Sequence, residues 1–89
     1  MTLQELRGEI EAVDREILRL FRARMDIAVR IAEEKAALGL PTRDSERAGT
    51  VLSGVGVQAE ALGLDPDLVR EIFSILIRMS EDLQDRKRG

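Results

Sequence analysis

A long apolar repeat at the start of the sequence restricts what this chain can fold into. Between residues 3 and 38, large aliphatic side chains recur at alternating steps of three and four, the spacing that places them along one face of a helix. Charged residues interrupt this seam twice, at Arg24 and at Glu34. The apolar members are Leu3, Leu6, Ile10, Val13, Ile17, Leu20, Ile27, Ile31 and Leu38.

Arg24 is the more informative of the two interruptions. A guanidinium stays charged at physiological pH and is costly to bury without a partner. Its place within an apolar seam therefore predicts a local hollow of the size of an anion. The competing interpretation is that Glu34, on the same seam, pairs with an arginine.

The repeat belongs to one very long N-terminal helix. Thr2 and Glu5 have the spacing of a capping box, and Gly39 followed by Pro41 predicts a stop, so the helix is expected over residues 3–38. It would be about 54 Å long, whereas a compact chain of this size has a radius of gyration of only about 12 Å. We therefore expect it to pair with a second copy in a two-fold dimer. The alternative is that the remaining helices fold back and cover it.

Two shorter helices are predicted in the rest of the chain. Asp44 is a candidate N-cap for a helix that runs to about Leu62 and is closed by Gly63. A glycine inside a helix costs roughly 1 kcal/mol relative to Ala, so we expect this helix to be short, bent or frayed. The glycines within it are Gly49, Gly54 and Gly56.

The third helix begins where Asp65 precedes Pro66, and we expect it to reach about Asp85, with a frayed charged tail beyond. Ser80 and Gln84, one turn apart, lie on or beside its apolar stripe. The expected fold class is therefore all-α, a single three-helix domain over residues 1–89. The stripe consists of Val69, Ile72, Phe73, Leu76, Met79 and Leu83.

The residue types that are missing exclude several classes of chemistry. The chain has neither His nor Cys, which removes imidazole bases, thiolate nucleophiles and the usual zinc sites and leaves only carboxylate-based metal binding open. A net charge of −3 and two Phe without Tyr or Trp argue against nucleic acid as a partner. No apolar run is long enough for a membrane span and no targeting segment is visible, so we expect no membrane association and a cytoplasmic location.

Basic side chains on the first helix are spaced to hold an anion. Lys35 follows Arg24 by about three turns, so both leave the same face about 16 Å apart and can bracket one small dianion. Arg7 lies about 25 Å along the helix from Arg24 and about 100° around it. It can reach that region only from a second chain paired antiparallel. The simpler interpretation of Arg7 and Lys35 is that they are solvated surface charges.

Two further polar clusters lie outside the first helix. One contains Arg43, Asp44 and Arg47, and the other contains Ser80 and Gln84. Each has a simpler structural interpretation: Asp44 as an N-cap, Ser80 as a small packing residue and Gln84 as a solvated side chain. No single residue among them identifies a function.

Their joint order and spacing are more specific. The matching segments are Leu6-Arg7-x-Glu-Ile10-x-Ala-x-Asp14, Arg22-Ala-Arg24-Met, Ala28-Val, Glu34-Lys35, Pro41-Thr-Arg43-Asp44-Ser-Glu-Arg47 and Phe73-Ser-Ile-Leu-Ile-Arg-Met-Ser80-x-x-x-Gln84. With them the chain resembles, over essentially its full length, the all-helical class of chorismate mutases, which are intertwined homodimers of three-helix chains. The resemblance implies an antiparallel dimer and a role in aromatic amino acid biosynthesis by the shikimate pathway.

The resemblance also implies how chorismate is held. Arg7 of the partner chain and Arg24 would grip its two carboxylates. Lys35 and Gln84 would donate hydrogen bonds to the ether oxygen whose bond breaks, so that the catalytic residues would be Lys35, Gln84 and Arg24. The reaction is a unimolecular [3,3] rearrangement to prephenate, which needs no nucleophile, base, metal or cofactor and depends on substrate conformation and preorganised positive charge.

The remaining substrate-binding residues implied by the resemblance are Asp44 at the ring hydroxyl and Arg47 and Ser80 at the carboxylate end, while Arg43 matches a common basic position. One position departs from the family pattern: Ala48 stands where the family usually has a Glu that contacts the ring hydroxyl. Losing that hydrogen bond would cost on the order of 1 kcal/mol, about fivefold in rate.

The departure keeps two alternatives open. Isochorismate pyruvate lyase shares the fold and also lacks that Glu, although Asp44 favours the mutase. The other alternative is a non-catalytic helical dimer or regulatory module, which Ala48 and the glycine-rich second helix would suit. The set of basic residues argues against it, because a purely structural dimer gains little from them.

Overall fold

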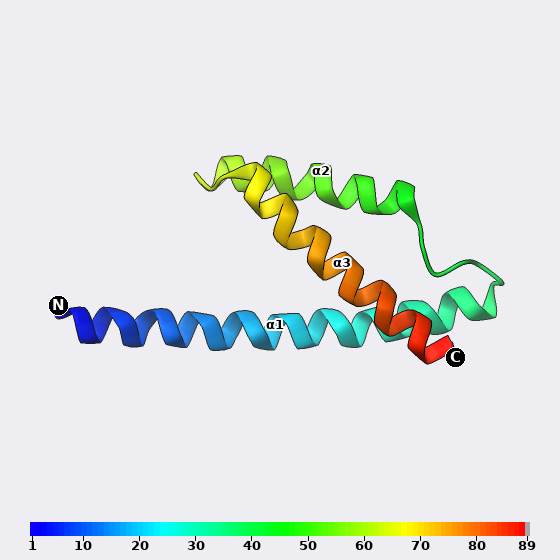
Figure 1. Cartoon of the computed structure of the whole chain (residues 1–89), viewed down its shortest axis with the longest axis horizontal. Coiled ribbons are helices and arrows are strands. Elements are labelled where there is room, and N and C mark those ends of the chain that lie inside the picture. Colours follow the sequence, from blue (N-terminus) through cyan, green and yellow to red (C-terminus); the bar gives the residue numbers. More distant parts are fainter. Residues whose placement is uncertain (89) are drawn as a thin grey trace.

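The first helix dominates the architecture. The computed structural model describes residues 1–88, over which the chain forms α1 (Leu3–Ala37), α2 (Ser45–Ala61) and α3 (Pro66–Arg88) and no strand (Figure 1).

Thr2 caps α1 by accepting a hydrogen bond from the Glu5 amide at 3.1 Å. At the other end Gly39 has a φ of +70°, and the Leu40 amide donates to the Lys35 carbonyl at 2.8 Å, which completes a Schellman stop. The predicted long helix is confirmed to within one residue.

Half of α1 projects away from the other helices. Every residue from 1 to 20 is exposed, whereas Met25, Ala28 and Ala32 are buried where α3 packs. The apolar seam itself stays open: Leu3 and Ile10 are each 63% exposed. The radius of gyration is 16.1 Å, well above the value of about 12 Å for a compact chain of this length. The alternative in which the shorter helices cover the seam is therefore wrong.

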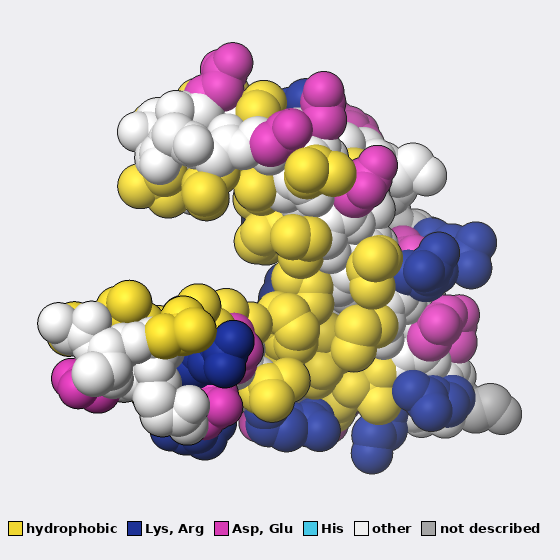
Figure 2. All heavy atoms as spheres, turned by 60° about the vertical axis from the view of Figure 1, so that its left-hand side comes forward, with side chains coloured by type: hydrophobic (Ala, Val, Ile, Leu, Met, Phe, Trp, Pro, Cys, Tyr) yellow, Lys and Arg dark blue, Asp and Glu magenta, His cyan; other side chains and the backbone are white. Residues whose placement is uncertain are grey.

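The order of packing creates a space between α1 and α2. The helix α3 packs against both of the others, whereas α1 and α2 do not pack on each other within residues 1–88. Figure 2 shows hydrophobic side chains lining a notch between α2 and the projecting part of α1. Among the residues described, no helix combines the length and the apolar character that a membrane crossing requires.

The second helix has the predicted boundaries but not the predicted weakness. Asp44 caps it by accepting from the Arg47 amide at 3.0 Å, and Gly63, with a φ of +74°, ends it. The helix runs unbroken for 17 residues, so the expectation of a short or frayed helix is wrong. Packing on α3 supports it, and at Gly56 an added Cβ would lie only 3.1 Å from Cζ of Arg70. That glycine leaves room for the Arg70 side chain.

The third helix differs from its prediction at its end and in its buried face. The Asp65 carboxylate accepts from the amides of Asp67 and Leu68, as an N-cap does. The helix continues to Arg88, so the expectation that the chain frays after Asp85 is wrong for residues 86–88. Gly89 lies outside the described residues.

The buried line of α3 is Leu76, Ser80 and Gln84, successive residues one turn apart. Two members of the expected stripe, Ile72 and Met79, are 51% and 43% exposed. The predicted stripe was therefore only partly right. The helix α3 turns Ser80 and Gln84 toward α1, and not Ile72 and Met79. Polar groups consequently occupy the middle of a helix interface.

Replacing two glycines by Ala tests this account of the helices. At Gly49, inside α2, an added Cβ has nothing within 4 Å, so Gly49→Ala should raise the free energy of unfolding by roughly 1 kcal/mol. Gly63→Ala forces a side chain into the left-handed region and should lower it by about 1 kcal/mol. Urea unfolding at one fixed protein concentration measures both changes. Destabilisation by Gly49→Ala would contradict the continuous α2.

Candidate functional site

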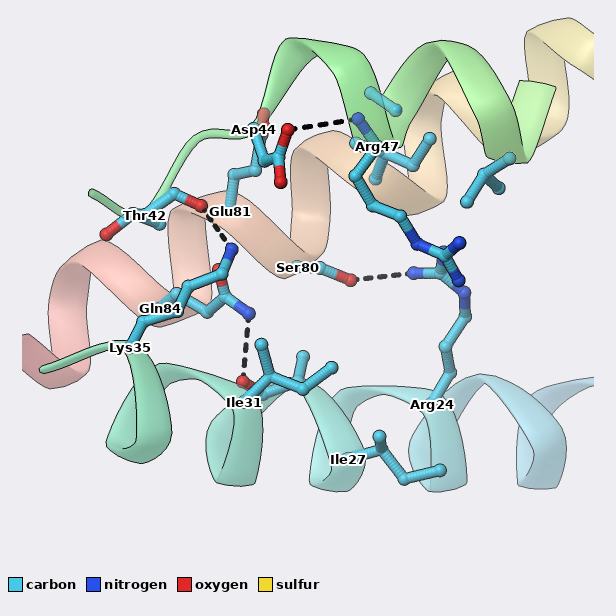
Figure 3. Close-up of a pocket in the computed structure, with 14 residues that line it drawn as sticks. Arg24, Ile27, Ile31, Lys35, Thr42, Asp44, Arg47, Ser80, Glu81 and Gln84 are labelled. Atoms are coloured by element: carbon cyan, nitrogen blue, oxygen red, sulfur yellow. Dashed lines mark hydrogen bonds between the residues drawn. The ribbon is translucent and has the colours of Figure 1, made fainter. Parts of the chain in front are cut away.

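One pocket gathers nearly all the predicted site residues. It lies between the C-terminal half of α1, the start of α2 and the C-terminal half of α3, and has a volume of about 360 Å³ (Figure 3), within the range of small-molecule sites. Its apolar walls consist of Ile27, Ala28, Ile31, Ala48, Val51 and Ile77. Its polar members are Arg24, Lys35, Thr42, Asp44, Arg47, Ser80, Glu81 and Gln84.

Arg24 occupies the hollow that its place in the seam predicts. Its Nη1 donates to Ser80 Oγ at 2.8 Å, and the Ser80 hydroxyl donates onward to the Leu76 carbonyl at 3.0 Å. The guanidinium is thus held in one direction by α3 while it lines the pocket. Glu34 is exposed, and no ion pair in the described part of the chain includes it. Within one chain, Glu34 therefore pairs with no arginine among residues 1–88.

A second guanidinium faces Arg24 across the pocket. Arg47 comes from the first turn of α2, where the Asp44 cap fixes its backbone. Figure 3 shows its side chain extending toward Arg24. Two facing cations repel each other, and a bound anion between them removes that repulsion and gains charge-assisted hydrogen bonds. This end of the pocket therefore suits a carboxylate.

Two further donors lie at the opposite end of the pocket. Lys35 Nζ donates to the Thr42 carbonyl at 2.7 Å, and Gln84 Nε2 donates to the Ala28 carbonyl at 2.9 Å. An ammonium carries three donors and an amide nitrogen two, so each group retains a donor after these bonds. Figure 3 shows both nitrogens at this end of the pocket, each pointing to its own carbonyl. Gln84 is only 5% exposed, so it is a buried donor and not a solvated side chain.

An acidic corner completes the polar lining. Asp44 lines the pocket while one of its oxygens caps α2. Glu81, which the sequence interpretation missed, lines it from α3. The signal was present in its position, one residue after Ser80 and three before Gln84 on the same helix. Thr42, whose carbonyl holds Lys35, was missed because a backbone acceptor leaves no trace in side-chain patterns.

The predicted site residue Arg7 and the neighbouring basic residue Arg43 lie outside the pocket lining. Arg7 is on the exposed N-terminal part of α1, and its predicted role from another copy of the chain stays a prediction. Arg43 has a side chain 72% exposed, with its Nε 4.0 Å from a carboxylate oxygen of Glu81. No group of three or more metal-ligating His, Cys, Asp or Glu side chains comes together within the described residues.

The arrangement suits the binding of an anion. Its donors are guanidinium, ammonium, amide and hydroxyl groups aimed into a pocket with apolar walls. Such preorganised positive charge stabilises negative charge that develops on a bound molecule. The walls restrict which conformers of that molecule fit.

Comparisons with known proteins are consistent with this chemistry. The family model described as chorismate mutase type II matches residues 6–85. The T-protein of Enterobacter agglomerans is 33% identical over 85 residues, 96% of this chain, yet the match covers only 23% of that protein. The chorismate mutase of Methanocaldococcus jannaschii is 33% identical over 92% of this chain and 83% of its own length. A 4-amino-4-deoxychorismate mutase of Streptomyces venezuelae is 33% identical over 84% of this chain and 73% of its own length.

Proposed function

We propose that this chain, which belongs to the type II chorismate mutase family, converts chorismate to prephenate in a pocket shared by two copies of the chain. The observation that carries the proposal is that one pocket holds two separate pairs of donor side chains, one pair at each end. Arg24 and Arg47 face each other at one end, and Lys35 and Gln84 lie at the other. Chorismate presents carboxylates and an ether oxygen to match them.

The reaction asks little of the chain beyond positioning and charge. The carbon–oxygen bond of the enolpyruvyl ether breaks while a new carbon–carbon bond forms to the ring, and no atom is gained or lost. Negative charge grows on the ether oxygen as its bond breaks. Lys35 and Gln84 donate to that oxygen from the positions that Thr42 and Ala28 fix. The apolar walls favour the folded conformer in which the reacting carbons approach.

A second copy of the chain completes the site. The seam on the projecting half of α1 is exposed along its length, with Leu3, Ile10 and Val13 each more than half exposed. Burying such a face against an antiparallel copy removes a large apolar area from water. The same pairing brings the partner copy's Arg7 toward Arg24. It thereby supplies a further cation for the second carboxylate of the substrate.

Direct assay of turnover tests the proposal. Purified protein should consume chorismate, followed by its absorbance, and chromatography should identify prephenate as the product. Isochorismate is assayed in parallel because Ala48 leaves the pyruvate lyase open as an alternative. Salicylate and pyruvate from isochorismate, with little prephenate from chorismate, would favour the lyase. A folded protein that consumes neither substrate would be a non-catalytic module.

Removing the seam arginine separates an enzyme from a structural module. Arg24→Leu should lower kcat/KM at least about 100-fold, because one positioned donor is typically worth that much. It should leave helix content and oligomeric state unchanged, since Leu restores the apolar repeat. The matched control is Arg30→Leu, an exposed residue of the same helix outside the pocket lining. Comparable losses in the two variants would contradict the assignment of Arg24.

The pH profile tests the role of the neutral amide. The chain has no His, the residue whose charge ordinarily changes between pH 6 and 8, so kcat/KM should vary less than about threefold there. In Gln84→Glu the new carboxyl must be protonated to donate, and burial raises the pKa of such a group. Activity of that variant should therefore fall as pH rises through its raised pKa. A steep loss in the unmodified protein over the same range would contradict the proposal.

A further inference from the structure

Glu81, in the acidic corner of the pocket, has no task in the proposed mechanism. It reaches this corner from α3, and its side chain is only 22% exposed. Figure 3 shows Glu81 beside Asp44, near the start of α2 and away from Arg24. A carboxylate that is largely shielded from water at a ligand pocket is costly unless donors hold it.

The contacts of Glu81 do not account for its placement. Within residues 1–88 its one ion pair is with Arg43, whose Nε lies 4.0 Å from Oε1, beyond hydrogen-bond distance. Arg43 is itself 72% exposed, so the pair contributes little to stability. The neighbouring carboxylate, Asp44, already receives the Arg47 amide. Glu81 therefore keeps acceptor capacity that no protein donor uses closely.

Inside α2, the facing wall of the pocket supplies no carboxylate at Ala48. Ala48, on α2, lines the same pocket and contributes only a methyl group. If the carboxylates of chorismate lie at Arg24 and Arg47 and its ether at Lys35 and Gln84, its one remaining polar group is the ring hydroxyl. That group is a hydrogen-bond donor, and the two carboxylates of the acidic corner are acceptors that line the same pocket. One of them, Asp44, already caps α2, whereas Glu81 has no such task.

We infer that Glu81 accepts a hydrogen bond from the ring hydroxyl of the substrate and selects substrates that carry a donor at that ring position. The inference rests on the proposed function, because it places chorismate in this pocket. The carboxylate that binds the ring hydroxyl thus lies on α3. On the α2 wall opposite, Ala48 supplies no carboxylate. A ring amine, protonated near neutral pH, would pair with the same carboxylate more strongly, as an ion pair.

Substitutions at Glu81 test the contact. Glu81→Ala should lower kcat/KM for chorismate about ten- to a hundredfold, the range for losing a hydrogen bond to a charged acceptor. Glu81→Gln keeps a neutral acceptor and should lose only a few-fold. Arg43→Ala is the control for the exposed ion pair and should change kcat/KM less than about twofold. An unchanged rate in Glu81→Ala, or an equal loss in Arg43→Ala, would overturn the inference.

Two further measurements distinguish a substrate contact from a structural role. Glu81→Gln should impair 4-amino-4-deoxychorismate, as substrate or competitive inhibitor, more than it impairs chorismate, because only the amine loses an ion pair. A structural defect would affect both equally. Adding Ala48→Glu to Glu81→Ala should restore part of the loss, since it returns a carboxylate to the same pocket. Equal effects on the two compounds, or no restoration, would count against the contact.

Failure of the inference is distinguishable from failure of the proposed function. If the unmodified protein turns over chorismate and Glu81→Ala does so equally well, only the role of Glu81 fails. If the unmodified protein shows no turnover, calorimetric binding of chorismate to the two proteins decides. Weaker binding by Glu81→Ala supports the contact, equal binding rejects it, and no binding by either protein rejects both proposals.

Discussion

The pocket depends on two hydrogen bonds that join α1 to α3 within its walls. Arg24 donates to Ser80 at 2.8 Å, and Gln84 donates to the Ala28 carbonyl at 2.9 Å. At each of these places a hydrogen bond joins the helices where most helix interfaces have close-packed apolar side chains. Both also aim a donor group into the pocket. The same two interactions thus set the distance between the helices and orient the groups that are proposed to meet the substrate.

The second constraint is the imbalance between α1 and the rest of the chain. A helix of 35 residues is packed over only its C-terminal half, and the aliphatic seam of the other half remains in water. Because the hydrophobic effect scales with the apolar area removed from water, this face favours association with a second copy. The further cation proposed for a dicarboxylate is Arg7, which lies beside that face on the same half of α1. Assembly and chemistry are therefore proposed to use one surface.

Local signals made the helices predictable, and long-range packing limited the prediction of the site. Thr2, Gly39, Asp44 and Gly63 define helix ends through bonds to residues a few positions away, so the boundaries of α1 and α2 followed from the sequence. The shared face of Arg24 and Lys35 followed from helical geometry.

Other features depend on how α3 is rotated against its neighbours, which no single helix encodes. That rotation buries Ser80 and Gln84, leaves Met79 exposed and turns Glu81 into the pocket. It also explains why α2 stays continuous despite its glycines, because the support comes from α3 and not from intrinsic propensity.

The most direct test of a pocket shared between chains is complementation between two inactive variants, Arg7→Ala and Arg24→Ala, unfolded together and refolded. If each site takes Arg7 from one chain and Arg24 from the other, mixed dimers carry one intact site, and statistical assortment restores about a quarter of the unmodified activity. Recovery of that size would support the shared pocket, and no recovery above the separately refolded variants would contradict it.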